Sequence, residues 1–168
     1  MICNRKESKI MKKLLAFALI AVLTVCCFAA CGESAASYAD NIPVADLADA
    51  ADAALGDSSL TVVPDNYLIN MNGLDLAMFE EYAVKMKMVD ASIDEYGIFK
   101  APDDASVSAI EKVAKDYLAM RLDTWNPSYL AEEKPKMEKA TVKVMGRYIV
   151  YGILADDAKE AVFTAIEN

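Results

Sequence analysis

Three stretches of the chain place apolar side chains every three or four positions, which is the spacing of one face of a helix. They are residues 44–55, residues 105–125 and the segment after Asp157. Aspartates precede the second and third stretches, where a side chain can accept hydrogen bonds from the free N–H groups of a first helical turn. In the third helix the predicted inner face consists of Ala158, Ala161, Val162, Ala165 and Ile166.

Between these helices the period of the pattern changes to two, which predicts two β-hairpins. Residues 84–88 alternate and lead to a partner strand at 96–100, while residues 141–145 alternate and precede the apolar segment 148–154. Gly146-Arg147 fits a two-residue hairpin turn with glycine in the first position. Because residues 148–154 are apolar on both faces, we expect this strand to be central in its sheet.

Hairpins interleaved with helices are typical of the α+β class. We expect a mostly antiparallel sheet built from two hairpins, with helices packed on one face. Residues 42–168 are long enough to form a single globular domain with its own core, and we expect a monomer. Residues 31–41, which are small and polar after Cys31, predict a flexible spacer before this domain.

The first 30 residues have the pattern of a lipoprotein signal peptide. Basic residues precede an unbroken apolar run at 14–28, and either Met1 or Met11 is compatible with the start of translation. That run is shorter than the roughly 20 apolar residues of a membrane-spanning helix. It ends in Phe28-Ala29-Ala30-Cys31, which resembles the lipobox that lipoprotein signal peptidase recognises, with Phe28 where leucine is preferred. We therefore expect a lipid on Cys31 and a place on the extracytoplasmic face of the cell membrane.

Residue usage excludes several kinds of chemistry. The chain has no histidine, and the three cysteines other than Cys31 lie in the predicted signal peptide. Hydrolases with a Ser-His-Asp or Cys-His arrangement, disulfides and the usual zinc and iron sites are therefore excluded. We expect no cofactor and no metal site.

Net charge bears on the partners. Loss of residues 1–30 removes five of the 17 basic and one of the 26 acidic side chains, which leaves a net charge of −13. Such a surface repels phosphate backbones and anionic lipid headgroups, so nucleic acid is not an expected partner and membrane attachment has to come from the lipid.

Several segments together resemble a known family. They are residues 80–100 (EEYAVKMKMVDASIDEYGIFK), Arg121, Tyr129-Leu130 and residues 146–149. The pattern resembles small lipoproteins of clostridial-type Gram-positive bacteria that are described only as a domain of unknown function. The resemblance spans roughly residues 42–168. It implies an extracytoplasmic location and a domain layout, and it implies no catalytic residues.

Charged side chains give few candidate sites. The acidic stripe of Asp46 and Asp49 on the first helix is interpreted as a solvated face. Asp90, Asp94 and Glu95 are interpreted as a solvated hairpin tip, and the pattern there does not fit a calcium-binding loop. Arg121 and Arg147, the two arginines of the predicted domain, are candidate contacts for an anionic ligand, although ordinary ion pairs with the acidic excess are the simpler interpretation.

The leading functional hypothesis is a non-catalytic, membrane-anchored module that binds another envelope protein or a small ligand. One alternative is a carboxylate-based hydrolase of cell-wall glycans, which needs two acidic side chains at a suitable separation. Another is an accessory lipoprotein of a transport system. The sequence identifies neither the ligand nor a catalytic residue.

Overall fold

The structure, a computed structural model, describes residues 40–56, 60–126 and 128–167, and within these residues five strands form one sheet with the order β1-β2-β3-β5-β4. The strands are β1 (Leu60–Val62), β2 (Glu81–Lys87), β3 (Glu95–Lys100), β4 (Thr141–Met145) and β5 (Tyr148–Ile153). Each neighbouring pair is antiparallel. Both predicted hairpins are present, and the pairing of β3 with β5 joins them into one sheet.

Five helices accompany the sheet in the described residues. They are α2 (Val44–Leu55), α3 (Asp65–Asn70), α4 (Val107–Asp123), α5 (Lys134–Glu138) and α6 (Asp156–Glu167), with single 3-10 turns η1 (Leu76–Met78), η2 (Asp104–Ser106) and η3 (Ala131–Glu133). The three long helices are those that the sequence predicts. In the part of the chain that the structure describes, no helix is both long enough and apolar enough to cross a membrane.

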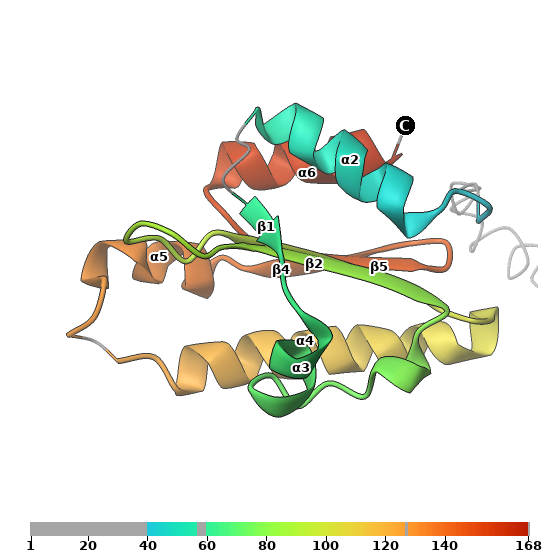
Figure 1. Ribbon diagram of the computed structural model, residues 1–168, viewed down its shortest axis with the longest axis horizontal. Helices are drawn as coiled ribbons and strands as arrows, with labels where there is room; N and C mark the ends of the chain where they lie inside the picture. The colour runs from blue at the N-terminus through green and yellow to red at the C-terminus, as the bar shows by residue number, and fades with distance from the viewer. Residues whose placement is uncertain (1–39, 57–59, 127, 168) are drawn as a thin grey trace, which may run out of the picture. The chain divides into compact units, whose positions relative to one another are not determined.

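The α+β class is confirmed, but the expected packing of the helices on one face of the sheet is wrong. Helices α2 and α6 cover one face, and α4 covers the other with α3 beside it (Figure 1). The reason lies in β3 and β5, in which every residue is buried. Two strands that are buried on both faces need a helical layer on each side.

Each face of the sheet has its own hydrophobic core. Phe99, Ile149 and Tyr151 pack against α4, whereas Ile98 and Val150 pack against α2 and α6. The strand predicted to be central, β5, indeed lies between β3 and β4.

The buried face of α6 differs from the predicted one. It consists of Lys159, Val162, Phe163 and Ile166, so the helix is rotated away from Ala161 and Ala165. Burying an aromatic ring removes far more apolar surface from water than burying a methyl group, which explains the rotation. The Lys159 ammonium is satisfied there because it donates to the Lys139 carbonyl oxygen at 2.6 Å.

Residues 1–39 lie outside the described residues. This range contains the predicted signal peptide, the residues 28–30 of the lipobox, Cys31 and nearly all of the predicted spacer.

Candidate functional site

A groove of about 540 Å³ lies along the part of β2 that β1 does not reach. Strand β1 pairs with residues 85–87, and one further hydrogen bond runs from the Val63 N–H to the Val84 carbonyl oxygen at 2.8 Å. Pro64 and the start of α3 at Asp65 then turn the chain away from the sheet. Residues 81–83 of β2 therefore form an open sheet edge, and we call the space beside them the edge groove.

The lining of the edge groove shows how far it extends along this strand. Residues 81–85, five consecutive residues of β2, all contribute to it. The groove therefore runs along β2 from the open edge at residues 81–83 to the last residues that β1 covers.

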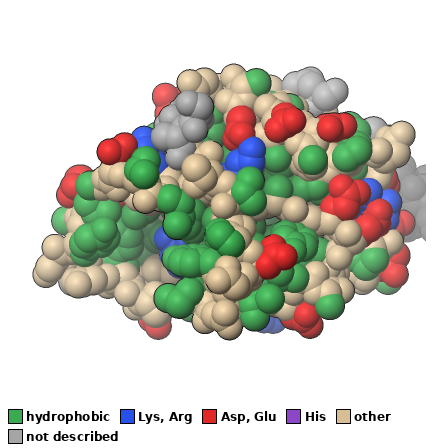
Figure 2. Space-filling view, in the orientation of Figure 1, with side chains coloured by type: hydrophobic (Ala, Val, Ile, Leu, Met, Phe, Trp, Pro, Cys, Tyr) green, Lys and Arg blue, Asp and Glu red, His purple; other side chains and the backbone are tan. Residues whose placement is uncertain are grey.

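Helix α2 and the chain after β1 form the two walls. The lining residues outside β2 are Val44, Ala45, Ala48, Asp49, Val62, Val63 and Asp65. Most of this surface is apolar, and the Val62 side chain is 65% exposed. Figure 2 shows hydrophobic side chains gathered over the middle of the face that β1 and α3 present, with acidic side chains above and beside them. The groove is thus an apolar channel with an acidic rim.

Most charges of the rim already have partners inside the chain. Lys85 forms an ion pair with Asp52 of α2. The Asp65 carboxylate accepts a hydrogen bond from the Tyr82 hydroxyl at 2.9 Å. Asp49 differs, because it forms no hydrogen bond or ion pair with the residues that the structure describes, although its charge acts on the nearby Tyr96 hydroxyl. Asp49 is therefore the rim carboxylate that remains available.

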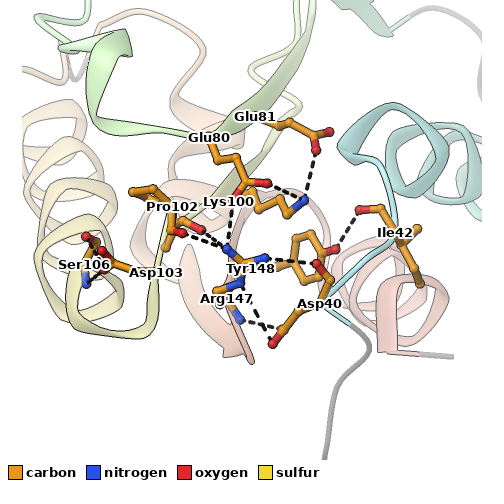
Figure 3. Close-up of polar contacts among 11 residues, drawn as sticks. Asp40, Ile42, Glu80, Glu81, Lys100, Pro102, Asp103, Ser106, Arg147 and Tyr148 are labelled. Atoms are coloured by element: carbon orange, nitrogen blue, oxygen red, sulfur yellow. Dashed lines mark hydrogen bonds and ion pairs between the residues drawn. The ribbon is translucent and has the colours of Figure 1, made fainter.

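Glu81 belongs to a polar network that fixes the first turn of α2 beside the groove (Figure 3). Its carboxylate accepts hydrogen bonds from the Val44 N–H at 2.8 Å and from the Lys100 ammonium at 3.0 Å. These two bonds hold the pKa of Glu81 below its usual value. Lys100, which is almost fully buried, also pairs with Glu80 at 2.9 Å. The network thereby attaches the start of the domain to β2 and β3.

Arg147, one of the two candidate anion contacts, closes the same network (Figure 3). It lies in the β4–β5 turn and donates to Glu80 at 2.8 Å and to the carbonyl oxygens of Ala101 and Pro102. Its guanidinium also donates to the Asp40 carbonyl oxygen at 3.3 Å. Internal acceptors thus engage this arginine, and its role is to hold the chain around Asp40 against the sheet.

Arg121, the other candidate, belongs to a separate cluster of polar side chains on the α4 face of the sheet. It donates to the Glu95 carboxylate at 2.6 Å, and the hydroxyls of Tyr117 and Tyr151 donate to the same carboxylate at 2.6 and 2.7 Å. We call these four residues the Glu95 cluster. Burial, together with the charge of Glu95, raises the pKa of both tyrosines above its usual value, so their hydroxyls stay protonated and can donate.

A glycine makes room for this cluster. In the β3–β5 register Gly97 lies opposite Tyr151, and the tyrosine ring lies across it. A Cβ atom on Gly97 would be 2.6 Å from Cζ of that ring, which real structures do not tolerate. Only glycine at this position lets Tyr151 reach Glu95.

The interpretation of Asp90, Asp94 and Glu95 as a solvated tip is wrong for Glu95. This residue begins β3 and its side chain is 0% exposed, whereas Asp94 pairs with Lys136 at 2.7 Å. The sequence does indicate this burial, because Glu95 shares the two-residue period of Gly97 and Phe99 and therefore faces the α4 core with them. An unpaired carboxylate there would be costly, which is why two tyrosines and an arginine surround it.

The structure therefore does not bring Arg121 and Arg147 together, since each serves a different cluster of internal acceptors. Binding of an anionic ligand by either remains a prediction that no contact supports. Within the described ranges, no group of three or more acidic, histidine or cysteine side chains is arranged to hold a metal ion. The edge groove is a feature that the sequence did not predict.

Comparison with known proteins assigns the chain to a family. A family model described as a domain of unknown function (DUF4358) matches residues 53–154, which is more than half of the chain. The chain belongs to this family. The expected membership of a family of unknown function is thus confirmed, over a shorter range than residues 42–168. No curated protein and no solved structure matches the chain.

Proposed function

We propose that this protein is a membrane-anchored extracytoplasmic lipoprotein whose domain is a non-catalytic binding module, with the edge groove as its binding site. The observation that carries the proposal is the groove itself: an open strand edge beside an apolar channel of about 540 Å³. Its volume lies within the range of ligand pockets, roughly 300–1,000 Å³. Exposed apolar surface rimmed by charge is typical of interaction sites.

The geometry favours binding over glycan hydrolysis. A carboxylate-based hydrolase needs two acidic side chains that are free to act as acid and as base or nucleophile. In the edge groove Glu81 and Asp65 are engaged by internal donors, and Asp49 is the one lining carboxylate without a hydrogen bond or ion pair to the described chain. One free carboxylate can contact a bound partner, but it does not supply the pair of acidic side chains that hydrolysis requires.

The proposed lipid would keep the groove close to the membrane. Cys31 lies nine positions before Asp40, where the Arg147 network holds the chain. Nine residues span at most about 30 Å even when fully extended. The first turn of α2, which lines the groove with Val44 and Ala45, follows directly. A partner in the groove would therefore be a component of the envelope near the membrane surface. A neighbouring transport protein is one such component.

The anchor is tested by fractionation of cells that express the full chain. Cys31→Ala is expected to yield an uncleaved or released species, and Cys27→Ala, in the same segment, is expected to give the mature membrane-bound form. Membrane-bound protein of mature size from Cys31→Ala would contradict the lipid anchor.

Binding at the groove is tested by placing a photocrosslinking phenylalanine derivative at position 62, with position 89 as the control. Val62 lines the groove, whereas Val89 is similarly exposed in the β2–β3 loop and lies outside the groove lining. We expect one defined envelope product from position 62 alone. Ala45→Trp, which fills the groove, should abolish it, and Ala54→Trp on the exposed part of α2 should not. A product that persists in Ala45→Trp would reject the groove as the binding site, and no product at all would reject binding of an envelope component there.

A further inference from the structure

We propose that the edge groove accepts an extended peptide segment that carries lysine or arginine beside an apolar residue and that pairs with the main chain of β2 at Tyr82. This inference rests on the proposed binding function and names the chemistry of the partner. Three independent features of the groove point to it: the direction of the main-chain groups, the apolar channel, and the sign of the free charge.

The main chain of Tyr82 faces the groove. Lys87 N–H donates to the Asp94 carbonyl oxygen on the β3 side, whereas the Val84 carbonyl oxygen accepts from Val63 on the β1 side. Main-chain groups of a strand alternate in direction, so those of Tyr82, two residues before Val84, point to the same side as those of Val84. If the β1 register continued, residue 65 would lie opposite Tyr82.

That place is empty because α3 begins at Asp65. The Asp65 side chain bonds the Tyr82 hydroxyl, and its main chain follows the helix instead of the sheet. An extended peptide can take the vacated place and bond the Tyr82 main chain, which is the usual way in which a peptide adds to an open sheet edge. A compact small molecule would leave this edge unused.

The side chains of such a peptide would meet two kinds of surface. Those that point toward α2 would contact Ala45 and Ala48 and come near Asp49, and those on the opposite face would come near Val63, which belongs to the core on the α4 side. Since Asp49 has no partner in the described chain and Lys85 is already paired with Asp52, the free charge of the rim is negative. Charge complementarity therefore selects a cationic side chain flanked by apolar ones.

The free edge is short, so the contact should be weak. Residues 81–83 extend about 10 Å at roughly 3.3 Å per residue, which accommodates about three residues of a partner. An interface of this size is typical of transient recognition. Attachment of both partners to one membrane would raise their effective concentration and offset the low affinity.

The test uses the full chain in detergent and three blocked pentapeptides. The first is acetyl-Lys-Val-Lys-Val-Lys-amide, the second has glutamate in place of each lysine, and the third is the lysine peptide with N-methylated valines. We expect the lysine peptide to bind and to slow hydrogen exchange of the Tyr82 amide, measured by NMR. The glutamate peptide should bind at least about fivefold more weakly, and N-methylation should weaken binding about fivefold through loss of main-chain bonds.

Matched variants locate the charge effect. Asp49→Asn should weaken binding of the lysine peptide about threefold, and Asp46→Asn, on the same helix but outside the groove lining, should not change it. Equal binding of the lysine and glutamate peptides would overturn the cationic preference. Insensitivity to N-methylation would overturn strand addition in favour of a site for a cationic small molecule. Protection of Tyr82 that depends on protein concentration without peptide would identify a second copy of the chain as the occupant.

The two proposals fail in different ways. If position 62 yields a product that Ala45→Trp abolishes while none of the peptides binds, the groove is a binding site and the peptide inference is wrong. If the peptides bind as expected while position 62 yields no product, the chemistry of the groove is right and the proposed envelope function is wrong.

Discussion

Glu95 and Asp49 are both carboxylates beside the same sheet, and the protein surrounds them in opposite ways. Glu95 is fully enclosed on the α4 face and receives hydrogen bonds from two tyrosines and from Arg121. Asp49 lies on the rim of the edge groove on the α2 side and has no hydrogen bond or ion pair within the described chain. One region is closed and saturated, and the other is open and has an unused charge.

This difference separates a structural role from a binding role. Burying a carboxylate is costly unless donors replace the lost water, and the donors that replace it at Glu95 all come from within the fold. A rim carboxylate that keeps its water has no such requirement and can exchange that water for a partner. In a chain with many carboxylates, the hydrogen-bond and ion-pair partners of each one therefore indicate its role better than the number of carboxylates does.

The largest effect is expected from Glu95→Ala. The Tyr151 hydroxyl would lose its acceptor in a fully buried position, and Arg121 would lose its ion pair, so the free energy of unfolding should fall by about 3–5 kcal/mol. Urea unfolding followed by the fluorescence of Trp125, the only tryptophan, measures this. Glu111→Ala, which removes the exposed pair with Lys115 on α4, is the control and should change stability by less than about 1 kcal/mol. Equal effects of the two substitutions would mean that the cluster is not a structural unit.

A somewhat smaller loss is expected from Gly97→Ala. The added Cβ would displace the Tyr151 ring from its place across β3 and weaken its bond to Glu95, and such overpacking destabilises by about 1–3 kcal/mol. Gly152→Ala is a matched control in β5. Its Cβ would meet Cγ of the Lys159 side chain at 3.2 Å, and that flexible chain can move. The prediction is wrong if both alanines have the same effect in thermal unfolding.

The contribution of Glu81, which lines the groove, to the free energy of unfolding should depend on pH. Bonds from Val44 N–H and Lys100 lower its pKa in the folded state, so the unfolded chain binds the proton more readily. The stability that Glu81 contributes is present above its unfolded pKa of about 4.3 and is lost as pH falls through the lower folded value. Glu81→Gln should therefore flatten the decrease in unfolding free energy below about pH 5. An unchanged decrease would show that other carboxylates account for it.

The smallest effect on stability is expected from Asp49→Asn. An exposed side chain without partners in the described chain should change the free energy of unfolding by no more than about 0.5 kcal/mol in either direction. Differential scanning calorimetry of this variant beside Glu95→Ala tests the comparison directly. A loss above about 1 kcal/mol would show that Asp49 supports the fold, and it would weaken the case for the groove as a site with unused charge.

Much of the architecture could be predicted because it depends on local periodicity. The helices at 44–55 and 107–123 bury the faces that their spacing predicts, and both hairpins follow from alternation. Helices α3 and α5 were not predicted because they are only six and five residues long and lie in polar segments that contain or follow a proline. A helix this short depends on its packing and not on its own propensity.

The sequence by itself determined the α+β class and the two hairpins. It also indicated the resemblance to a family of unknown function, and it excluded mechanisms that need a histidine side chain. The tertiary structure alone decided which donors surround Glu95 and that β2 has an open edge. The first depends on a register that sets Tyr151 opposite Gly97, 54 residues away. The second depends on where β1 stops beside β2. Local periodicity reports which side chains share a face of an element, but only long-range pairing determines what lies next to that element.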